Sequence, residues 1–421
     1  MIRIDLDRLL FQLLCLYAFL VPFELVLEIF FGIDTIFKPY RVVCLVLIGL
    51  YSLRAIKQGG FSLSKDFRED SFLYLVFIYG ILISFYNMIV VEFHLGKFYN
   101  KLFQNALYLA VFAIVKGLPM TREQLRKIQR YLLWGLVING IYVLANRYTG
   151  ITLNRQSGFF DNPNYLSLGL IYALGYLAIN LKSVKFSDKV LYLILIPICL
   201  LAFLVAGSRT GALVMMVVLL LMLSFQSLRS ILIGLVVLAV LSPVYLLVSD
   251  TNLSLRPTTV LEDRFQDLDI GDDPRFPIWE GVIRASMKTN FVGLGLGQFE
   301  ARFPEFYREE NNIVIYEMLA YGYYLSPHSD YLAVLVSFGI VGLVFFLLFF
   351  FFSIRKILSL FWRSTGDSLL RMQLIGIIAL VIFGIAAENF VSGLYWLILT
   401  LSTKCAFEID EAQEFGNTKV V

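Results

Sequence analysis

Charged residues are scarce in this sequence: Asp, Glu, Lys and Arg make up 16% of its 421 residues, against about 25% in soluble domains. Apolar residues make up 59%, and the mean hydropathy is +0.77. A soluble protein cannot bury that much apolar surface. Most apolar runs are about 16 to 25 residues long, close to the length at which a helix crosses a bilayer. The sequence therefore predicts an all-α, polytopic integral membrane protein.

Cysteine and histidine are also scarce, with four and two residues. The four cysteines lie in or next to apolar runs without CxxC spacing, so neither a disulfide framework nor a zinc site is predicted. The glycine run at 293–297, GLGLG, lacks the GxGxxG and GK[ST] patterns of nucleotide loops. The net charge of +3 indicates no nucleic-acid partner. We expect no metal and no cofactor.

Charged breaks between the apolar runs predict about twelve transmembrane helices and one long loop. The predicted spans are 9–30, 39–56, 71–91, 103–120, 131–147, 164–181, 190–206, 210–226, 230–249, 329–353, 372–388 and 393–407. They divide the chain into a membrane bundle at 1–249, a loop at 250–327, and the last three spans with a tail at 328–421. Within the loop, 276–289 and 299–310 have the pattern of short amphipathic helices.

The distribution of basic residues predicts the orientation in the membrane. An even number of spans puts both termini on one side, and most of the 35 basic residues fall in the breaks on that side. Because cytoplasmic loops carry an excess of Lys and Arg, we expect both termini to be cytoplasmic. The long loop then lies on the far side.

Four unusual segments gather on the far side, at or just outside helix ends. They are RQSGFFDNPNYLS at 155–167, GSRTGAL at 207–213, DPRFPIWEGV at 273–282 and PHSDYLAVLVSFGIVG at 327–342. Arg209 lies in a break of only about three residues between two apolar runs, and a charged residue so near hydrocarbon is usually functional. The simpler alternative is an arginine that anchors a hairpin at the lipid headgroups.

His328 begins the tenth predicted span, directly after Pro327. Imidazole is the side chain best suited to proton transfer near neutral pH, although a lone histidine at a helix start is more often a cap. The other histidine, His94, has no convergent neighbours in the sequence and is interpreted as an interfacial residue. Arg275 and Arg155 are of the type that holds phosphate oxygens through paired hydrogen bonds. Solvation and headgroup contact explain Arg155 equally well when it is taken alone.

Taken together, the segments resemble the O-antigen ligase and O-antigen polymerase superfamily of bacterial envelope glycan assembly. The resemblance rests on RxxxL at Arg209–Leu213, on Arg275 and Trp279 before the glycine run, and on His328 followed by Leu332, Gly339 and Gly342. NPN at 162–164 adds to it. It covers about 155–346. One departure is Ser329, where family members often have Asn.

The resemblance implies transfer of a glycan from undecaprenyl diphosphate to an acceptor hydroxyl at the periplasmic face of the inner membrane, with inversion and without a metal. His328 would be the base, and Arg209 and Arg275 would neutralise the diphosphate. The predicted substrate-binding residues are Arg155, Asn162, Asn164, Trp279 and Asp330, and Asp161 is a second candidate partner for the histidine or the acceptor. The partners implied are a carrier-linked glycan donor, a lipid or glycan acceptor, and membrane lipids.

Two alternatives stay open at the level of sequence. A ligase transfers finished glycan to lipid A-core, whereas a polymerase joins carrier-linked repeat units, and the donor chemistry is the same. A transporter or lipid flippase would also be polytopic. Such proteins place ionisable residues or broken helices at mid-membrane depth, and predicted spans five to ten carry almost no charge in their middles.

Overall fold

The computed structural model consists of helices and their connections throughout the residues that it describes. These are residues 5–32, 38–61, 67–90, 93–149, 156–224, 275–306, 325–364, 366–388, 390 and 392–404. The first part contains α1 (Leu6–Leu20), α2 (Val26–Phe31), α3 (Pro39–Gln58), α4 (Phe67–Val90), α5 (Leu95–Gly117), α6 (Arg122–Tyr148), α7 (Pro163–Asn180), α8 (Phe186–Ala206) and α9 (Arg209–Ser224). From residue 275 on follow α12 (Arg275–Lys288), α13 (Gln298–Arg302), the short 3-10 helix η4 (Phe303–Glu305), α15 (Asp330–Arg363), α16 (Ser368–Ala386) and α17 (Gly393–Thr403).

Six of the described helices are long and apolar enough to cross a membrane: α3, α4, α6, α8, α15 and α16. Two more, α9 and α17, are apolar but shorter. The described part of the chain is therefore all-helical, and its six candidate spans indicate a multi-pass membrane protein, as the sequence predicts. The count of twelve spans stays a prediction, since the predicted span at 230–249 lies outside the described residues.

Two predicted elements differ from the structure in length. The span predicted at 9–30 is divided into α1 and α2 around Pro22, whose carbonyl oxygen instead accepts a hydrogen bond from the Asn139 side chain at 3.0 Å. The amphipathic helix predicted at 299–310 is α-helical only to Arg302 and continues as the 3-10 helix η4, in which Pro304 has no N–H to donate to an α-helical hydrogen bond. Its last part, 307–310, lies outside the described residues. The helix predicted at 276–289 matches α12 closely.

Ion pairs define one end of the bundle, named here the Lys116 end. Three pairs join the ends of different helices: Arg54 with Asp7, Lys116 with Asp70 at 3.2 Å, and Arg122 with Asp367 at 3.6 Å. Lys116 and Asp70 are both almost fully buried, with side chains 1% exposed. This end thus holds the starts of α1, α4, α6 and α16 and the ends of α3 and α5.

Other polar contacts define the opposite end, named here the Lys38 end. Lys38 pairs with Glu24 at 2.5 Å and with Asp161 at 2.7 Å, and Lys101 pairs with Glu300 at 2.8 Å. These residues lie after α1, before α3, before α7, near the start of α5 and in α13. Successive long helices therefore run alternately between the two ends. The basic breaks of the sequence fall at the Lys116 end, and which end faces the cytoplasm stays a prediction.

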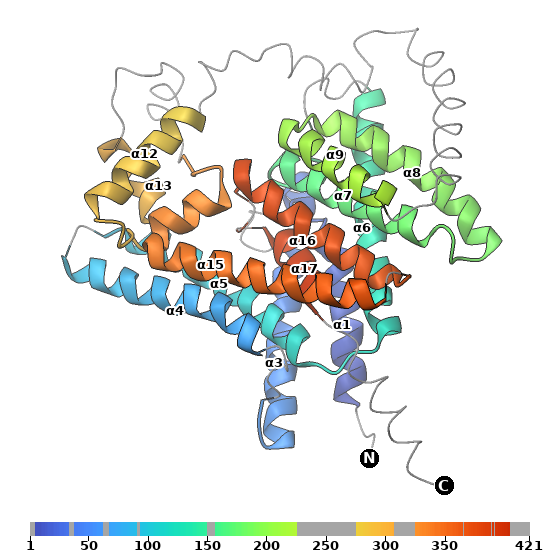
Figure 1. The fold of residues 1–421 in the computed structure, drawn as a ribbon, viewed down its shortest axis with the longest axis horizontal. Helices are drawn as coiled ribbons and strands as arrows, with labels where there is room; N and C mark the ends of the chain where they lie inside the picture. Colours follow the sequence, from blue (N-terminus) through green and yellow to red (C-terminus); the bar gives the residue numbers. More distant parts are fainter. Residues whose placement is uncertain are drawn as a thin grey trace.

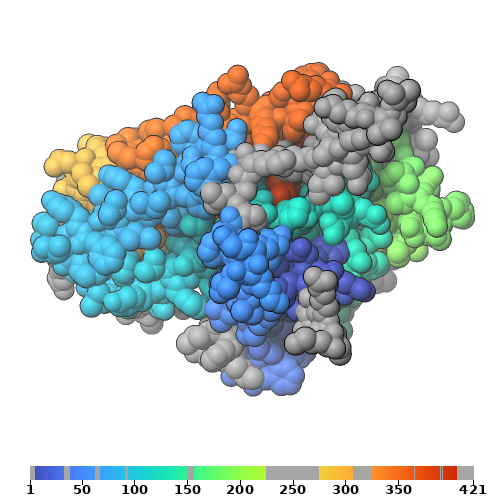
Figure 2. Space-filling model, turned by 90° about the horizontal axis from the view of Figure 1, so that it is seen from below, coloured from blue at the N-terminus to red at the C-terminus, as the bar shows by residue number. Residues whose placement is uncertain are grey.

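Aromatic side chains form much of the interior around α17. The Trp396 ring lies 5.7 Å from the Phe77 ring and 5.0 Å from the Phe390 ring, centroid to centroid. In Figure 1, α16 and α17 lie between the α12 and α13 side and the group of α7, α8 and α9. Figure 2 shows a face on which α3, α4 and α5 are displayed. Large apolar side chains of α3 and α4 are exposed, as helices in contact with lipid require: Val42, Leu45, Leu53, Ile56, Ile78, Leu82 and Ile89.

The long helix α15 is interrupted at Gly339, where φ is 66° and ψ is −170°. The backbone of the segment after α12 crosses it there. Ile340 donates its N–H to Phe291 O at 2.9 Å, and Leu294 donates its N–H to Val336 O at 2.8 Å. The segment thus satisfies backbone groups that the break in the helix leaves open.

The glycine run at 293–297 is the other side of this contact. Asn87 of α4 donates its side-chain amide to Gly293 O, and Ser84 accepts the Leu296 N–H, both at 2.9 Å. The run is therefore a backbone strap held between α4 and α15. The close approach explains the glycines, because a side chain on Gly293 or Gly295 would separate the strap from the helices.

Replacing Gly339 with alanine is expected to destabilise the protein strongly. Its backbone conformation is essentially restricted to glycine, which alone costs about 1–3 kcal/mol for another residue, and a Cβ would lie 2.3 Å from Phe291 O. Gly49→Ala in α3 is the control, because no atom lies within 4 Å of the added Cβ. Thermal unfolding in detergent measures both variants. Equal midpoints for Gly339→Ala and Gly49→Ala would contradict the account of the strap.

Candidate functional site

The helix that begins with Arg275 is connected directly to the histidine segment. Trp279, one turn along α12 from Arg275, donates its indole N–H to Pro327 O at 3.0 Å. Residues four apart on a helix share a face, so Arg275 and Trp279 lie on the side of α12 nearest this contact. The residue after Pro327 is His328. The structure thus brings together two segments that are about fifty positions apart in the sequence.

His328 has an unusual backbone conformation, with φ of 49°. Such values are uncommon outside glycine and persist only where surrounding contacts hold them. The next two residues supply those contacts: Ser329 donates its hydroxyl to Gly384 O at 3.1 Å, and Asp330 accepts the Phe390 N–H at 2.9 Å. Ser329 also caps α15, accepting the Leu332 N–H. The half-buried His328 is therefore fixed at the start of α15.

The segments that contain Asn164 and Arg209 are also in contact. Ser208 donates its hydroxyl to Asn164 Oδ1 at 2.8 Å and accepts the Gly211 N–H at 2.9 Å, which caps the start of α9. Asn162 caps α7 by accepting the Asn164 N–H at 2.9 Å. Arg209 is the first residue of α9. NPN and GSRTG therefore form one unit at the Lys38 end.

The connection between α16 and α17, named here the α16–α17 turn (387–392), contacts both of these units. Tyr165, next to Asn164, donates its hydroxyl to Glu388 O at 2.9 Å. On the other side, Asp330 accepts the Phe390 N–H. The turn therefore lies between the Asn164–Ser208 unit and the start of α15. Arg209, Arg275 and His328 come from the two sides of this single turn.

Beneath the histidine segment lies a cluster of buried charges that sequence reasoning missed. Lys101 of α5 pairs with Glu300 at 2.8 Å and lies 3.7 Å from Glu388, whose side chain is 8% exposed. Burial alone would raise the pKa of Glu300, but Lys101 outweighs it and holds this pKa below its ordinary value. All three residues line a cavity of about 40 Å³ together with Pro327. Lys101 thus balances two carboxylates directly behind the histidine segment.

Replacing Lys101 with methionine is expected to lower the free energy of unfolding by about 3–5 kcal/mol, because Glu300 and Glu388 are then buried without a counter-charge. Adding Glu388→Gln should restore part of the loss. Arg284→Gln is the control. Arg284 pairs with Glu280, one turn earlier on the same helix, at the surface, where such pairs contribute at most about 1 kcal/mol. Thermal unfolding of the purified variants tests this. A Lys101 variant as stable as the control would refute it.

A second buried pair organises the segment that leads to NPN. Lys38, with a side chain 6% exposed, binds both Glu24 and Asp161. Asp161 was a candidate partner of the histidine, and in the structure it is paired with Lys38 instead. Asn139 of α6 accepts the Phe159 N–H at 3.0 Å and thereby fixes the same segment. Arg155 lies outside the described residues.

Besides Asn162 and Asn164, two more of the predicted substrate-binding residues have protein partners in the structure. Asp330 is 1% exposed and holds the α16–α17 turn through Phe390, and Trp279 holds Pro327. Contact of either side chain with a substrate stays a prediction. Glu388 lies inside a predicted span, and an ionisable residue there is a signal of function. The sequence therefore contained a sign of Glu388, but not of its partner.

Within the described residues, no three His, Cys, Asp or Glu side chains gather so that they could hold a metal ion.

Comparison with known families gives one match: residues 193–347 match the family model described as O-antigen ligase. This segment, about a third of the chain, is thus similar to the O-antigen ligase and polymerase superfamily. The resemblance seen in the sequence is thereby confirmed. No curated protein and no solved structure matches the chain.

The O-antigen ligase segment contains Arg209, Arg275 and His328, and it ends within α15. It does not include the α16–α17 turn, Lys101 or NPN, which the structure places in contact with it. The match to the O-antigen ligase family and the apolar helices together indicate a multi-pass protein of the bacterial inner membrane.

Proposed function

We propose that the protein is a membrane glycosyltransferase that moves a glycan from undecaprenyl diphosphate to an acceptor hydroxyl, acting as an O-antigen ligase with lipid A-core as acceptor. His328 is the general base, and Arg209 and Arg275 bind the diphosphate. The observation that carries the proposal is the Trp279–Pro327 hydrogen bond, which joins the helix of Arg275 to the constrained backbone of His328.

The proposed step forms one bond and breaks another at the anomeric carbon. The acceptor hydroxyl oxygen attacks this carbon, its proton passes to the His328 imidazole, and the bond from the carbon to the diphosphate oxygen breaks with its electron pair on the diphosphate. Attack from the side opposite the leaving group inverts the configuration. A positioned base typically contributes about 10²–10⁴-fold to such a step.

The leaving diphosphate gains negative charge as the bond breaks, and fixed cations directed at that charge stabilise the transition state. Arg209 and Arg275 each begin a helix at the Lys38 end. Guanidinium groups hold phosphate oxygens through paired hydrogen bonds and keep their charge at any physiological pH. No step in the proposal requires a metal ion.

Further residues are proposed to bind substrate around this centre. Asn162 and Asn164 belong to the unit that carries Arg209, and Arg155 precedes them in sequence. Trp279 and Asp330 flank His328 and set the shape of its surroundings.

The proposed orientation puts the Lys38 end at the periplasm and both termini in the cytoplasm. Support comes from the basic breaks, which the structure gathers at the Lys116 end, since cytoplasmic loops are enriched in Lys and Arg. The proposed division has a bundle at 1–249, a periplasmic loop at 250–327 and a last membrane part at 328–421. A carrier-linked donor then reaches the site from the outer leaflet.

Reconstitution of the purified protein tests the proposed activity. Proteoliposomes receive undecaprenyl-diphosphate-linked glycan with either lipid A-core or a second carrier-linked unit, and products are separated by gel electrophoresis. Glycan joined to lipid A-core is the expected result. Products made only from two carrier-linked units would identify a polymerase, and the absence of transfer to either acceptor would contradict the proposal.

A further inference from the structure

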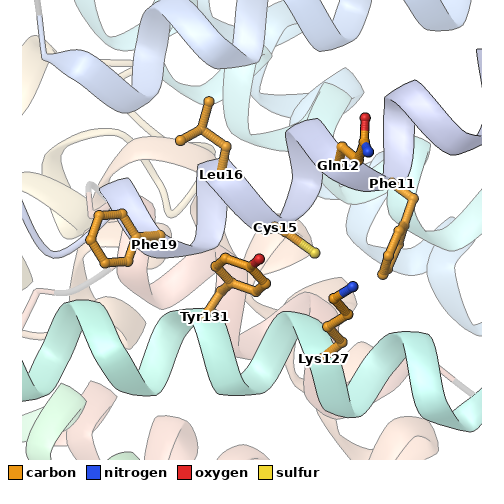
Figure 3. A pocket seen from close by; sticks show the side chains of 7 residues that line it. All are labelled: Phe11, Gln12, Cys15, Leu16, Phe19, Lys127 and Tyr131. Atoms are coloured by element: carbon orange, nitrogen blue, oxygen red, sulfur yellow. The ribbon is translucent and has the colours of Figure 1, made fainter.

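A cavity of about 280 Å³ lies between α1 and α6, far from the candidate site. It is lined by five residues of the first helix and two of the second: Phe11, Gln12, Cys15, Leu16, Phe19, Lys127 and Tyr131. Figure 3 shows Lys127 and Tyr131 rising from α6 toward Cys15 on α1. Its volume is just below the range of small-molecule sites, about 300–1,000 Å³. It therefore has room for part of a ligand whose remainder lies outside.

The cavity is a groove that closes toward the middle of the bundle. The two helices run in the same direction, and past the groove they approach so closely that a Cβ at Gly135 would lie 2.5 Å from Phe19 O. From Phe11 to Phe19 a helix advances about 12 Å. The groove thus has a blind end at Phe19 and its other end at Lys127, near the Lys116 end of the bundle.

The two ends of the groove differ in chemistry. Gln12 and Lys127 lie at the end near the bundle's edge, whereas Leu16 and Phe19 lie toward the middle. Leu16 is 43% exposed and Tyr131 is 40% exposed, so the groove opens on the lipid-facing side. This polarity matches an amphipathic molecule with an anionic head and a hydrocarbon tail, oriented as lipids are in a bilayer leaflet.

Lys127 differs from the other basic residues at the start of α6. Arg122 and Arg126 lie 3.6 and 3.7 Å from Asp367, and Arg130 lies against Tyr176. Among the described residues Lys127 makes no ion pair, and its ammonium group lies 5.7 Å from the centre of the Phe11 ring. Its charge is therefore available at the end of the groove that lies opposite the blind end.

We propose that this groove binds an anionic phospholipid of the membrane leaflet at the Lys116 end, with its phosphate at Lys127 and part of one acyl chain along Cys15, Leu16 and Phe19. A soluble phosphate would leave the apolar part of the groove without a partner, and a zwitterionic lipid would bring a cation of its own close to the Lys127 ammonium. The site lies at the end of the bundle opposite His328, so the proposal is independent of the glycosyltransferase function.

Native mass spectrometry of the full-length protein in detergent tests the proposal by titration with phosphatidylglycerol. Lys127→Gln removes the charge and keeps a polar, although shorter, side chain. Arg130→Gln is the matched control, since it makes the same change less than one turn away on α6 but outside the groove. We expect Lys127→Gln to weaken binding about fivefold, the effect of one lysine near an anionic lipid surface, and Arg130→Gln to leave it within twofold. Thermal unfolding confirms that both variants are folded.

The probes distinguish the sources of the ligand. Phosphatidylcholine should bind the wild type more weakly than phosphatidylglycerol, and millimolar inorganic phosphate should not displace the bound lipid. Equal losses in the two variants, equal binding of the two lipids, or displacement by inorganic phosphate would each overturn the proposal. So would a polyprenyl phosphate that binds in preference to phosphatidylglycerol and depends on Lys127 in the same way.

Discussion

Loss of His328 is expected to reduce glycan transfer by about 10²–10⁴-fold, the contribution of a general base. Asparagine is the sharper substitution, because it tolerates the positive φ of 49° at this position and cannot take up a proton near neutral pH. Donor binding should persist in His328→Asn, since the arginines are unchanged. The rate is measured in proteoliposomes with carrier-linked glycan, and donor binding is measured separately.

The chain offers a matched control in its other histidine. His94 precedes α5 at the same end of the bundle, and it contacts Gln298 through its backbone: the N–H donates to Gln298 Oε1, and the carbonyl accepts from Gln298 Nε2. His94→Asn should therefore retain both the fold and the transfer rate.

The pH profile adds a readout that a purely structural role would not change. Wild-type transfer should fall at low pH as the base is protonated, whereas the residual activity of His328→Asn should lose that dependence. If His328→Asn keeps full activity, or keeps the same acid limb at lower rate, another group is the base.

The sequence predicts the membrane class and most of the long helices because the apolar runs reflect the thickness of the bilayer. It also predicts α12, since the amphipathic pattern at 276–289 is strong. The division of the first span is harder to foresee: Pro22 marks it, but Asn139, more than one hundred positions away, stabilises it. The break at Gly339 is comparable, because its hydrogen-bond partners lie in the strap after α12.

The candidate site likewise has residues that the sequence predicts and residues that it does not. Arg209, Arg275 and His328 are visible in the sequence because each is a polar residue at an apolar boundary. The α16–α17 turn that lies between their segments is not, since Gly384 and Phe390 take part through backbone groups. Lys101, the partner of Glu388, also escapes notice, because pairing between α5 and the α16–α17 turn depends on how helices pack rather than on any local pattern.

Replacement of Arg209 or Arg275 by glutamine is expected to lower the rate of transfer by about 10²–10³-fold, the usual effect of removing one group that stabilises developing negative charge. The two arginines begin different helices, α9 and α12, on opposite sides of the α16–α17 turn. If both bind one diphosphate, their effects are coupled, and the double variant should lose less than the product of the two single losses.

Arg284→Gln is the control for a nonspecific effect of charge, because Arg284 lies on α12 and pairs with Glu280 at its surface. A loss in rate with unchanged donor binding would place the interaction in the transition state rather than in the ground state. Lysine in place of either arginine should restore only part of the rate, since a single ammonium group cannot make the paired hydrogen bonds of a guanidinium. Strictly multiplicative losses would mean that the arginines act on separate groups, and the α16–α17 turn would then separate two functions rather than join one site.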